Sequence, residues 1–273
     1  MCGLCPHHCH LAEGQTGLCA ARTNVDGAII CTNYGALTSI ALDPIEKKPL
    51  YHFHPGASIL SVGSYGCNLL CPFCQNHEIS RAKEGDVRTE TVSPEVLTQL
   101  AEDARKKYGN IGVAFTYNEP LVSYEYVRDS AKLLHEKALA VVLVTNGQIC
   151  EEPLKALLPH IDAMNIDVKG FTQTFYDWIG GDLATTKMTV ALAVEAGVHV
   201  EVTTLIVPGK NDNEKEMDAE ARWLASISPE IPLHLSRYFP RYHCEIPVTP
   251  VGTLQRLQHI AKEHLKYVHL GNV

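Results

Sequence analysis

Short apolar runs and longer amphipathic stretches alternate along the chain after residue 57. Six apolar runs have the length and β-branched content of buried strands: residues 58–63, 111–116, 140–146, 161–169, 199–207 and 232–238. Helical periodicity occurs at residues 94–108, 121–137, 152–158, 182–196, 213–227 and 251–266. Successive βα units predict a parallel sheet covered by helices. Six units rather than eight indicate an α/β fold of the open, partial (β/α)6 TIM-like barrel type.

The first 57 residues are rich in Cys, His and Gly and contain only short β-like stretches, at residues 28–32 and 36–42. A run with three prolines follows at residues 43–56 and interrupts regular structure. We therefore predict two parts: residues 1–57 as a small Cys-rich, metal-binding β module with its linker, and residues 58–273 as the barrel. Because the module directly precedes the first barrel strand, we expect it to fold back and narrow the barrel opening.

The composition is that of a globular protein. Of 273 residues, 45% are hydrophobic and 20% are charged, which excludes disordered, collagen-like and coiled-coil classes. No apolar run approaches the ~20 residues of a membrane helix, and residues 1–10 lack the basic and apolar regions of a signal peptide. We therefore expect a cytoplasmic protein without a membrane partner. With a net charge of −8 and no basic cluster, nucleic acid is not an expected partner.

Seven of the ten cysteines form two groups, and clustered, reduced thiols indicate metal binding. Cys67, Cys71 and Cys74 have C-x3-C-x2-C spacing. A closed zinc site or an ordinary ferredoxin cluster takes four protein ligands, whereas this group supplies three. A four-iron cluster held by three thiolates leaves one iron open to an exogenous ligand, as a catalytic cluster requires. The alternative is a zinc site completed by His77 or a distant residue.

The other group has C-x2-C-x3-C-x9-C spacing and consists of Cys2, Cys5, Cys9 and Cys19. Four thiolates allow a closed zinc site or a fully ligated iron–sulfur cluster. We interpret the group as a structural metal site that stabilises a segment too short to fold alone, with an auxiliary redox cluster as the alternative. The neighbouring His7, His8 and His10 are expected to be solvated.

Polar motifs follow the ends of the predicted strands. In chain order they occupy residues 67–74, 116–120, 145–147, 167–170, 207–209 and 236–238. The carboxyl ends of parallel strands meet at one rim of a barrel, which is where active sites of such barrels lie. The sequence therefore predicts one site at this rim.

These motifs carry a family resemblance. GCNLLCPFCQN, FTYNEP, VTNG, NIDVKG, VPG and HLSRYFPRY together resemble radical S-adenosylmethionine (radical SAM) enzymes of the pyruvate formate-lyase-activating-enzyme type. CGLCPHHCHLAEGQTGLCAARTN with DPIEKKPLYHFHPG resembles more narrowly the radical SAM subgroup named for the AmmeMemoRadiSam system. The eight-iron ferredoxin insert that some glycyl-radical activators carry after the cysteine loop is absent.

The resemblance implies roles for individual residues. Cys67, Cys71 and Cys74 would ligate a catalytic [4Fe–4S] cluster, and SAM would bind the fourth iron. A carboxylate at Glu119 could accept hydrogen bonds from the SAM ammonium. The candidate SAM-binding residues are Phe73 near the adenine, Gln75, Tyr117, Asn118, Glu119, Thr145, Asn146, Asp167, Lys169 and His234, with Thr145 and Asn146 chosen by strand-end position only.

Simpler interpretations exist for several of these residues. Residues 118–120 could be a helix start, with Asn118 as the cap and Pro120 in the first turn. Asp167 and Lys169 could be a surface ion pair worth under ~1 kcal/mol. His234, between two leucines, could be a hydrogen-bonded core histidine.

The implied chemistry is reductive. A low-potential donor, ferredoxin or flavodoxin, reduces the cluster, the sulfonium C–S bond of SAM breaks, and a 5′-deoxyadenosyl radical abstracts a substrate hydrogen. We expect an anaerobic, oxidoreductase-type enzyme whose unidentified substrate could be a protein. One alternative is a glycyl-radical enzyme activating enzyme, although we expect the substrate not to be a standard glycyl-radical enzyme. The other is an iron–sulfur or zinc electron-transfer or scaffold protein without SAM chemistry.

Overall fold

The computed structural model describes residues 1–273 and contains one large sheet of eight strands, in the order β12-β11-β10-β9-β8-β7-β5-β4. The strands are β4 (Ser39–Pro44), β5 (Ser58–Gly63), β7 (Asn110–Phe115), β8 (Ala140–Thr145), β9 (Ala163–Asp167), β10 (His199–Ile206), β11 (Leu233–Arg237) and β12 (Val268–Gly271). Every neighbouring pair is parallel except β4 with β5. The six strands expected from the apolar runs are all present, so the α/β partial-barrel prediction is confirmed.

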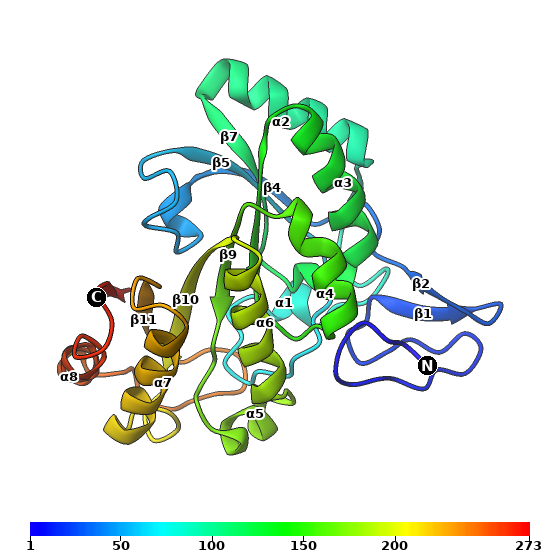
Figure 1. Ribbon diagram of the computed structural model, residues 1–273. Helices are drawn as coiled ribbons and strands as arrows, with labels where there is room; N and C mark the ends of the chain where they lie inside the picture. The colour runs from blue at the N-terminus through cyan, green and yellow to red at the C-terminus, as the bar shows by residue number, and fades with distance from the viewer.

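Helices cover the outer face of this sheet (Figure 1). The longer ones are α2 (Pro94–Tyr108), α3 (Tyr124–Glu136), α4 (Glu151–Leu157), α6 (Leu183–Glu195), α7 (Glu214–Ile227) and α8 (Val251–Ala261). The short ones are α1 (His77–Ser80), α5 (Gln173–Ile179) and the 3-10 helices η1 (Ile45–Lys47), η2 (Pro120–Ser123) and η3 (Leu158–His160). Helix α2 begins as expected, because Ser93 Oγ accepts a hydrogen bond from the Val96 N–H and Pro94 occupies the first position.

The two faces of the sheet carry different residues because side chains alternate along a strand. Large apolar side chains such as Val113, Leu143 and Ile166 face the helices and are fully buried in the main core. The inner face carries a smaller apolar cluster, made of Ile45, Leu50, Ile59, Ala114, Val142 and Ala163. Farther along the inner face, the hydroxyl of Thr203 donates a hydrogen bond to Asn165. The inner face thus combines an apolar cluster with buried polar side chains.

The first 57 residues pack on the barrel instead of forming a separate unit. β4 pairs with β5 along its whole length, from Ser39 opposite Gly63 to Pro44 opposite Ser58. The boundary predicted after residue 57 therefore falls inside one continuous sheet. The physical reason is that β5 would otherwise be an exposed edge strand with unpaired backbone groups.

Residues 45–57 cross the amino-terminal ends of β9 and β10. Leu50 is fully buried among the inner apolar cluster. The Asn165 side chain donates a hydrogen bond to the Pro49 carbonyl oxygen at 2.8 Å. Glu201 accepts hydrogen bonds from the backbone N–H groups of Tyr51 at 3.0 Å and His52 at 2.7 Å. This segment closes the end of the barrel opposite the predicted site, so the fold-back occurs at the far end from the one we expected to be narrowed.

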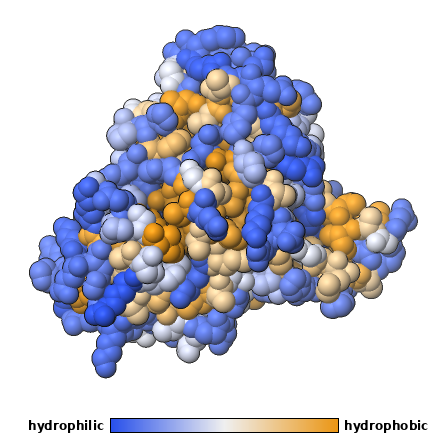
Figure 2. All heavy atoms as spheres, in the orientation of Figure 1, coloured by the Kyte–Doolittle hydropathy of each residue, from blue (hydrophilic) through white to orange (hydrophobic).

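The chain before β4 forms small β pairs. β1 (Arg22–Val25) is antiparallel to β2 (Ala28–Cys31), and β3 (Ala36–Leu37) is antiparallel to β6 (Glu90–Thr91). The β1–β2 hairpin projects from the side of the barrel, and apolar surface gathers there (Figures 1 and 2). Val25 and Ile30 are among its exposed side chains. No helix has both the length and the apolar character needed to cross a membrane.

The closing segment gives a first prediction. Leu50→Ala should lower the free energy of unfolding by about 2–5 kcal/mol, because it leaves a cavity among residues that cannot collapse into it. Chemical denaturation followed by circular dichroism measures the change. Leu100→Ala is the matched control, since Leu100 is 40% exposed on α2, and its loss should stay below about 1 kcal/mol. Equal losses in the two variants would show that residues 45–57 do not seal the barrel.

Candidate active site

The cysteine loop follows β5 and has no regular structure until α1. Gly66 begins it with a φ of 90°, and a Cβ there would lie 2.5 Å from the Cys19 carbonyl oxygen, so the position requires glycine. The Leu70 N–H donates to the Ile179 carbonyl at 2.7 Å, and the Asn76 side chain donates to the Tyr117 carbonyl at 2.7 Å. These bonds fix the loop at the carboxyl-terminal rim, as predicted from the strand ends.

The thiols of this loop lie close enough to raise one another's pKa. Burial raises the pKa of Cys67 well above its usual value, and the neighbouring Glu119 and Cys71 raise it further. Burial also raises the pKa of Cys71 to about 12, although the positive charge of Lys169 opposes the shift. Buried thiolates need a positive charge beside them, which a metal centre supplies. The donor set of Cys67, Cys71 and Cys74 therefore fits a metal cluster with three protein ligands.

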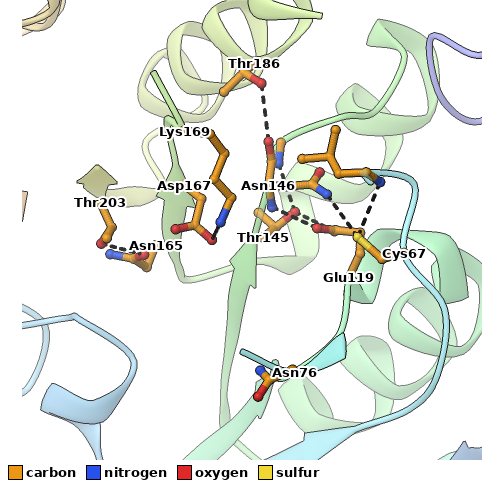
Figure 3. Close-up of polar contacts among 12 residues, drawn as sticks. Cys67, Asn76, Glu119, Thr145, Asn146, Asn165, Asp167, Lys169, Thr186 and Thr203 are labelled. Carbon is orange, nitrogen blue, oxygen red and sulfur yellow. Dashed lines mark hydrogen bonds and ion pairs between the residues drawn. The ribbon is translucent and has the colours of Figure 1, made fainter. Parts of the chain in front are cut away.

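Two N–H groups point at the Cys67 sulfur. The Leu69 backbone N–H lies 3.4 Å from Cys67 Sγ, and the Asn146 side-chain amide lies 3.6 Å from it (Figure 3). Hydrogen bonds to ligating sulfurs stabilise the thiolate and tune the potential of an iron–sulfur cluster. Asn146, which was chosen by strand-end position alone, is thus in contact with a cluster-loop cysteine.

Glu119 is a buried carboxylate beside this loop. The Thr145 hydroxyl donates to Oε1 at 2.6 Å, the Asn146 N–H donates to Oε2 at 2.8 Å, and the Leu121 N–H donates to Oε1 at 3.0 Å (Figure 3). Burial nevertheless raises the pKa of Glu119 to about 7. These partners are neutral donors, so a cationic ligand group beside Glu119 would gain a charge-assisted hydrogen bond.

The Asn118 side chain forms hydrogen bonds with backbone groups and does not face an open site. Its Oδ1 accepts a hydrogen bond from the Ser64 N–H at 2.9 Å, and its Nδ2 donates to the carbonyl oxygens of Tyr65 at 3.1 Å and Gly66 at 3.0 Å. The expected helix start is present one residue later, because Glu119 caps η2 and Pro120 begins it. Asn118 therefore positions the chain that leads into the cysteine loop.

Tyr117 connects the rim to the inner wall of the barrel. Its φ is 72°, and a Cβ at Gly63 would lie 2.8 Å from its ring. Its hydroxyl donates to Asp43 Oδ2 at 2.8 Å. Lys48 lies 2.9 Å from the same carboxylate and 4.7 Å from the centre of the tyrosine ring. Tyr117, Asp43 and Lys48 thus form a polar group on the inner side of β4.

Asp167 and Lys169 form an ion pair at the end of β9, with 2.9 Å between Lys169 Nζ and Asp167 Oδ2 (Figure 3). Their side chains are only 26% and 18% exposed, so this is not a solvated surface pair. The charges of both groups influence the pKa of Cys71. The ion pair therefore lies next to the cysteine loop, as the sequence predicted.

The two other predicted residues of the loop differ in burial. Phe73 is buried against three aromatic rings, those of Phe175, Trp178 and Tyr238. Gln75 is exposed. Phe73 is therefore part of an apolar wall beside the loop, whereas Gln75 is not.

The structure does not bring His234 to the cysteine loop. Its Nε2 lies 2.6 Å from Glu201 Oε2, and its ring packs on His269 and against the edge of Tyr51. Glu201 is the residue that also binds the segment closing the barrel. His234 is thus a buried, hydrogen-bonded histidine of the inner wall, as in the simpler interpretation.

Sequence reasoning missed Asn68. Its Nδ2 donates to the Gln148 carbonyl at 2.7 Å, and its Oδ1 accepts from Asn146 Nδ2 at 2.9 Å. Its backbone oxygen is 2.7 Å from His7 Nε2. Asn68 occupies an unspecified position of the C-x3-C motif, so nothing in the sequence marked it.

The four N-terminal thiols meet at one small pocket. Its lining consists of Cys2, Leu4, Cys5, His7, Cys9, Leu11, Gly17, Leu18, Cys19, Arg22 and Val122. Nowhere in the chain do three His, Cys, Asp or Glu side chains approach closely enough to share a single metal ion. This holds for both cysteine groups. Thiolates that ligate different irons of one cluster stand farther apart than thiolates on one ion.

The family follows from comparison with known proteins. The model of the radical SAM superfamily matches residues 61–224. The chain belongs to the radical SAM superfamily. It is therefore an enzyme, and membership implies a [4Fe–4S] cluster and SAM as its cofactors. The matched residues begin within β5 and contain the cysteine loop, Glu119 and the Asp167–Lys169 pair.

Individual proteins are similar to this chain over most of its length. The chain is 39% identical over 275 residues to the uncharacterized protein MJ0808 of Methanocaldococcus jannaschii, covering 100% of this chain and 81% of that protein. It is 24% identical to the indoleacetate decarboxylase activating enzyme of Tractidigestivibacter scatoligenes, over 81% of this chain and 70% of that one. The crystal structure of Streptococcus suis SuiB bound to precursor peptide SuiA shares the fold, with a TM-score of 0.60 at 14% identity, over 76% of this chain and 47% of SuiB.

The contact at Gly66 gives the second prediction. Gly66→Ala should reduce the iron bound after reconstitution and destabilise the protein by about 2 kcal/mol or more, because the new Cβ collides with the Cys19 carbonyl at a strained φ. Gly85→Ala is the matched control, since Gly85 has a φ of 86° but open space around it. The control should cost about 1 kcal/mol from backbone strain alone. Iron content and urea denaturation that do not distinguish the two variants would contradict the prediction.

Proposed function

We propose that the chain cleaves SAM reductively at a [4Fe–4S] cluster held by Cys67, Cys71 and Cys74, and that hydrogen is then abstracted from a substrate at the same rim. The single observation that carries this proposal is Glu119. It is a buried carboxylate with only neutral partners, and its charge is felt by Cys67. The α-amino group of SAM, bound to the open iron through its nitrogen lone pair, would donate an N–H to this carboxylate. An electron-transfer or scaffold protein would not need such a group.

The chain's own residues would bind and orient the reactants. Thr145 and Asn146 hold Glu119 in place, and Asn146 also contacts the Cys67 sulfur. The Asp167–Lys169 pair supplies donors and acceptors for the polar end of SAM, and the wall around Phe73 supplies an apolar surface for its adenine. The cluster and SAM, when bound, supply one electron and a 5′-deoxyadenosyl group that abstracts hydrogen. The protein excludes water from this step by burial.

The substrate would enter from the carboxyl ends of the strands. The opposite end is closed by residues 45–57. The loop after β11 also leans on the cysteine loop, because the His243 N–H donates to the Pro72 carbonyl at 2.9 Å and Tyr242 stacks on His77. With the opposite end closed, a substrate or a segment of a protein substrate would pass the cysteine loop first. It would then reach the polar group of Tyr117, Asp43 and Lys48 inside the barrel. A ferredoxin or flavodoxin would supply the electron.

A second candidate is activation of a glycyl-radical enzyme. It is favoured by the relative named as an indoleacetate decarboxylase activating enzyme. A SAM-dependent glycyl signal in the electron paramagnetic resonance (EPR) spectrum of a co-expressed partner would establish this role. The N-terminal cysteine motif supports membership of the AmmeMemoRadiSam subgroup. In that case the substrate would not be a standard glycyl-radical enzyme.

The test of the proposed function is anaerobic reconstitution with iron and sulfide, followed by dithionite and SAM. We expect 5′-deoxyadenosine to form, and Cys71→Ala to abolish it because one ligand of the cluster is lost. Cys31→Ser is the matched control, since Cys31 donates its hydrogen bond to Asn33 and belongs to neither cysteine group. Absence of 5′-deoxyadenosine from the fully loaded wild-type enzyme would refute the proposal.

The role given to Glu119 makes a separate prediction about pH. Glu119→Gln should weaken SAM binding by about 1.5–3 kcal/mol, roughly tenfold or more, with the cluster still loaded. Because the pKa of Glu119 is raised to about 7, wild-type affinity should fall as the pH drops through about 7 and the carboxyl is protonated.

Isothermal titration of the oxidised, reconstituted enzyme with SAM measures both effects. Glu119→Gln should lose less affinity than the wild type on the acidic side, because the amide at residue 119 takes up no proton while the SAM amino group still does. Glu95→Gln, which removes an exposed carboxylate at the start of α2, should behave as wild type. If Glu119→Gln bound SAM with wild-type affinity, and that affinity fell at low pH as much as in the wild type, Glu119 would not contact SAM.

A further inference from the structure

The N-terminal cysteines form a closed set of four donors around an apolar pocket. Cys2, Cys5, Cys9 and Cys19 all line it, and leucine and valine side chains make up much of the remaining wall. Backbone hydrogen bonds curl the segment, since the Cys2 N–H donates to the Cys9 carbonyl and the His8 N–H donates to the Cys5 carbonyl. No side chain of the protein fills this space. A group with four thiolate sites and no need of water fits it.

The two cysteine groups, 48 positions apart between Cys19 and Cys67, touch in the fold. The Cys67 N–H donates to the Cys19 carbonyl oxygen at 3.1 Å. This approach is possible because Gly66 has no Cβ, which would lie 2.5 Å from the same oxygen. One covalent path with a single hydrogen bond therefore runs from the sulfur of Cys19 to the sulfur of Cys67.

A second connection runs through side chains. Asn68 is bonded to the N-terminal segment, because its backbone oxygen lies 2.7 Å from Nε2 of His7, which lines the pocket. Its Oδ1 accepts from Asn146 Nδ2, and the same Asn146 amide contacts Cys67 Sγ at 3.6 Å (Figure 3). A structural zinc site would require neither of these links. The short, bonded route from Cys19 to Cys67 is what an electron relay between the two thiol groups requires.

We propose that Cys2, Cys5, Cys9 and Cys19 bind an iron–sulfur cluster that passes electrons to the catalytic cluster through the Cys19–Cys67 contact. This inference rests on the proposed function, because the acceptor is the catalytic cluster. One electron from a ferredoxin or flavodoxin reduces the N-terminal cluster. That electron then reduces the catalytic cluster and leaves the N-terminal one oxidised again. No bond forms or breaks, and no proton is needed.

The position of the N-terminal group suits this role. The N-terminal loops lie at the periphery of the molecule, beside the β1–β2 hairpin (Figure 1). A protein donor can therefore approach the N-terminal group without occupying the rim where the substrate enters.

Metal analysis of the wild-type protein, reconstituted anaerobically with iron and sulfide, is the first test. The relay requires more than the about four irons of a single cluster, and two distinct EPR signals after reduction. About four irons with one zinc per chain would overturn the relay. That result would leave the proposed function intact, provided 5′-deoxyadenosine still forms. If the wild-type protein makes no 5′-deoxyadenosine with dithionite, it is the proposed function that fails.

The second test compares two reductants. Cys5→Ala should lose 5′-deoxyadenosine formation driven by reduced flavodoxin, while formation driven by dithionite, a small reductant, persists. Cys31→Ser is the matched control in the same segment and should keep both activities. Equal losses with both reductants, or no loss with either, would show that the N-terminal group is not a relay. If Cys5→Ala does not fold, flavodoxin titration of the wild-type protein decides: reduction of a single EPR-active centre would overturn the proposal.

Discussion

The arrangement of the rim depends on the burial of the Glu119 carboxylate. It joins the ends of two strands, because the residue follows β7 while two of its three donors belong to residues 145 and 146 at the end of β8. Burying a carboxylate is costly unless donors surround it, so the loops after both strands are fixed by the need to supply them. The adjacent Asn118 fixes the chain that leads into the cysteine loop. These hydrogen bonds offset the cost of burying the carboxylate. Because the donors are neutral, the negative charge remains available to a cationic ligand.

The N-terminal segment completes the barrel as well as carrying cysteines. β4 covers the edge of β5, and its inward-facing Asp43 holds both Lys48 and Tyr117. The following residues close the amino-terminal end through Glu201, whose pKa is lowered to about 2: burial opposes this shift, but hydrogen bonds from His199, His234 and two backbone N–H groups outweigh it. The carboxylate stays ionised at neutral pH and keeps the closing segment in place. Access is thereby restricted to the rim that carries the cysteine loop.

Local patterns predicted the elements well and the long-range contacts poorly. The six strands and the motifs at their ends were predictable because apolar runs and helical periodicity are properties of neighbouring residues. The role of β4 was not, because its burial alternates only between half-buried and exposed positions and it ends in Asp43-Pro44. His234 was predicted at the SAM site, yet its partner Glu201 lies 33 positions away. Asn68 gains its importance from contacts with residues about 80 positions distant, which no sequence window contains.

Burial of the thiols also determines their protonation before any metal binds. Burial raises the pKa of Cys5 to about 11 and that of Cys71 to about 12, so at neutral pH both are protonated before metal binds. The protein folds without placing several thiolate charges against one another, which would be destabilising. Metal binding must then displace these protons, and its affinity rises with pH. Since Cys19 and Cys67 share a backbone hydrogen bond, and Gly66 has no Cβ to obstruct it, the two cysteine groups are held next to each other in the fold.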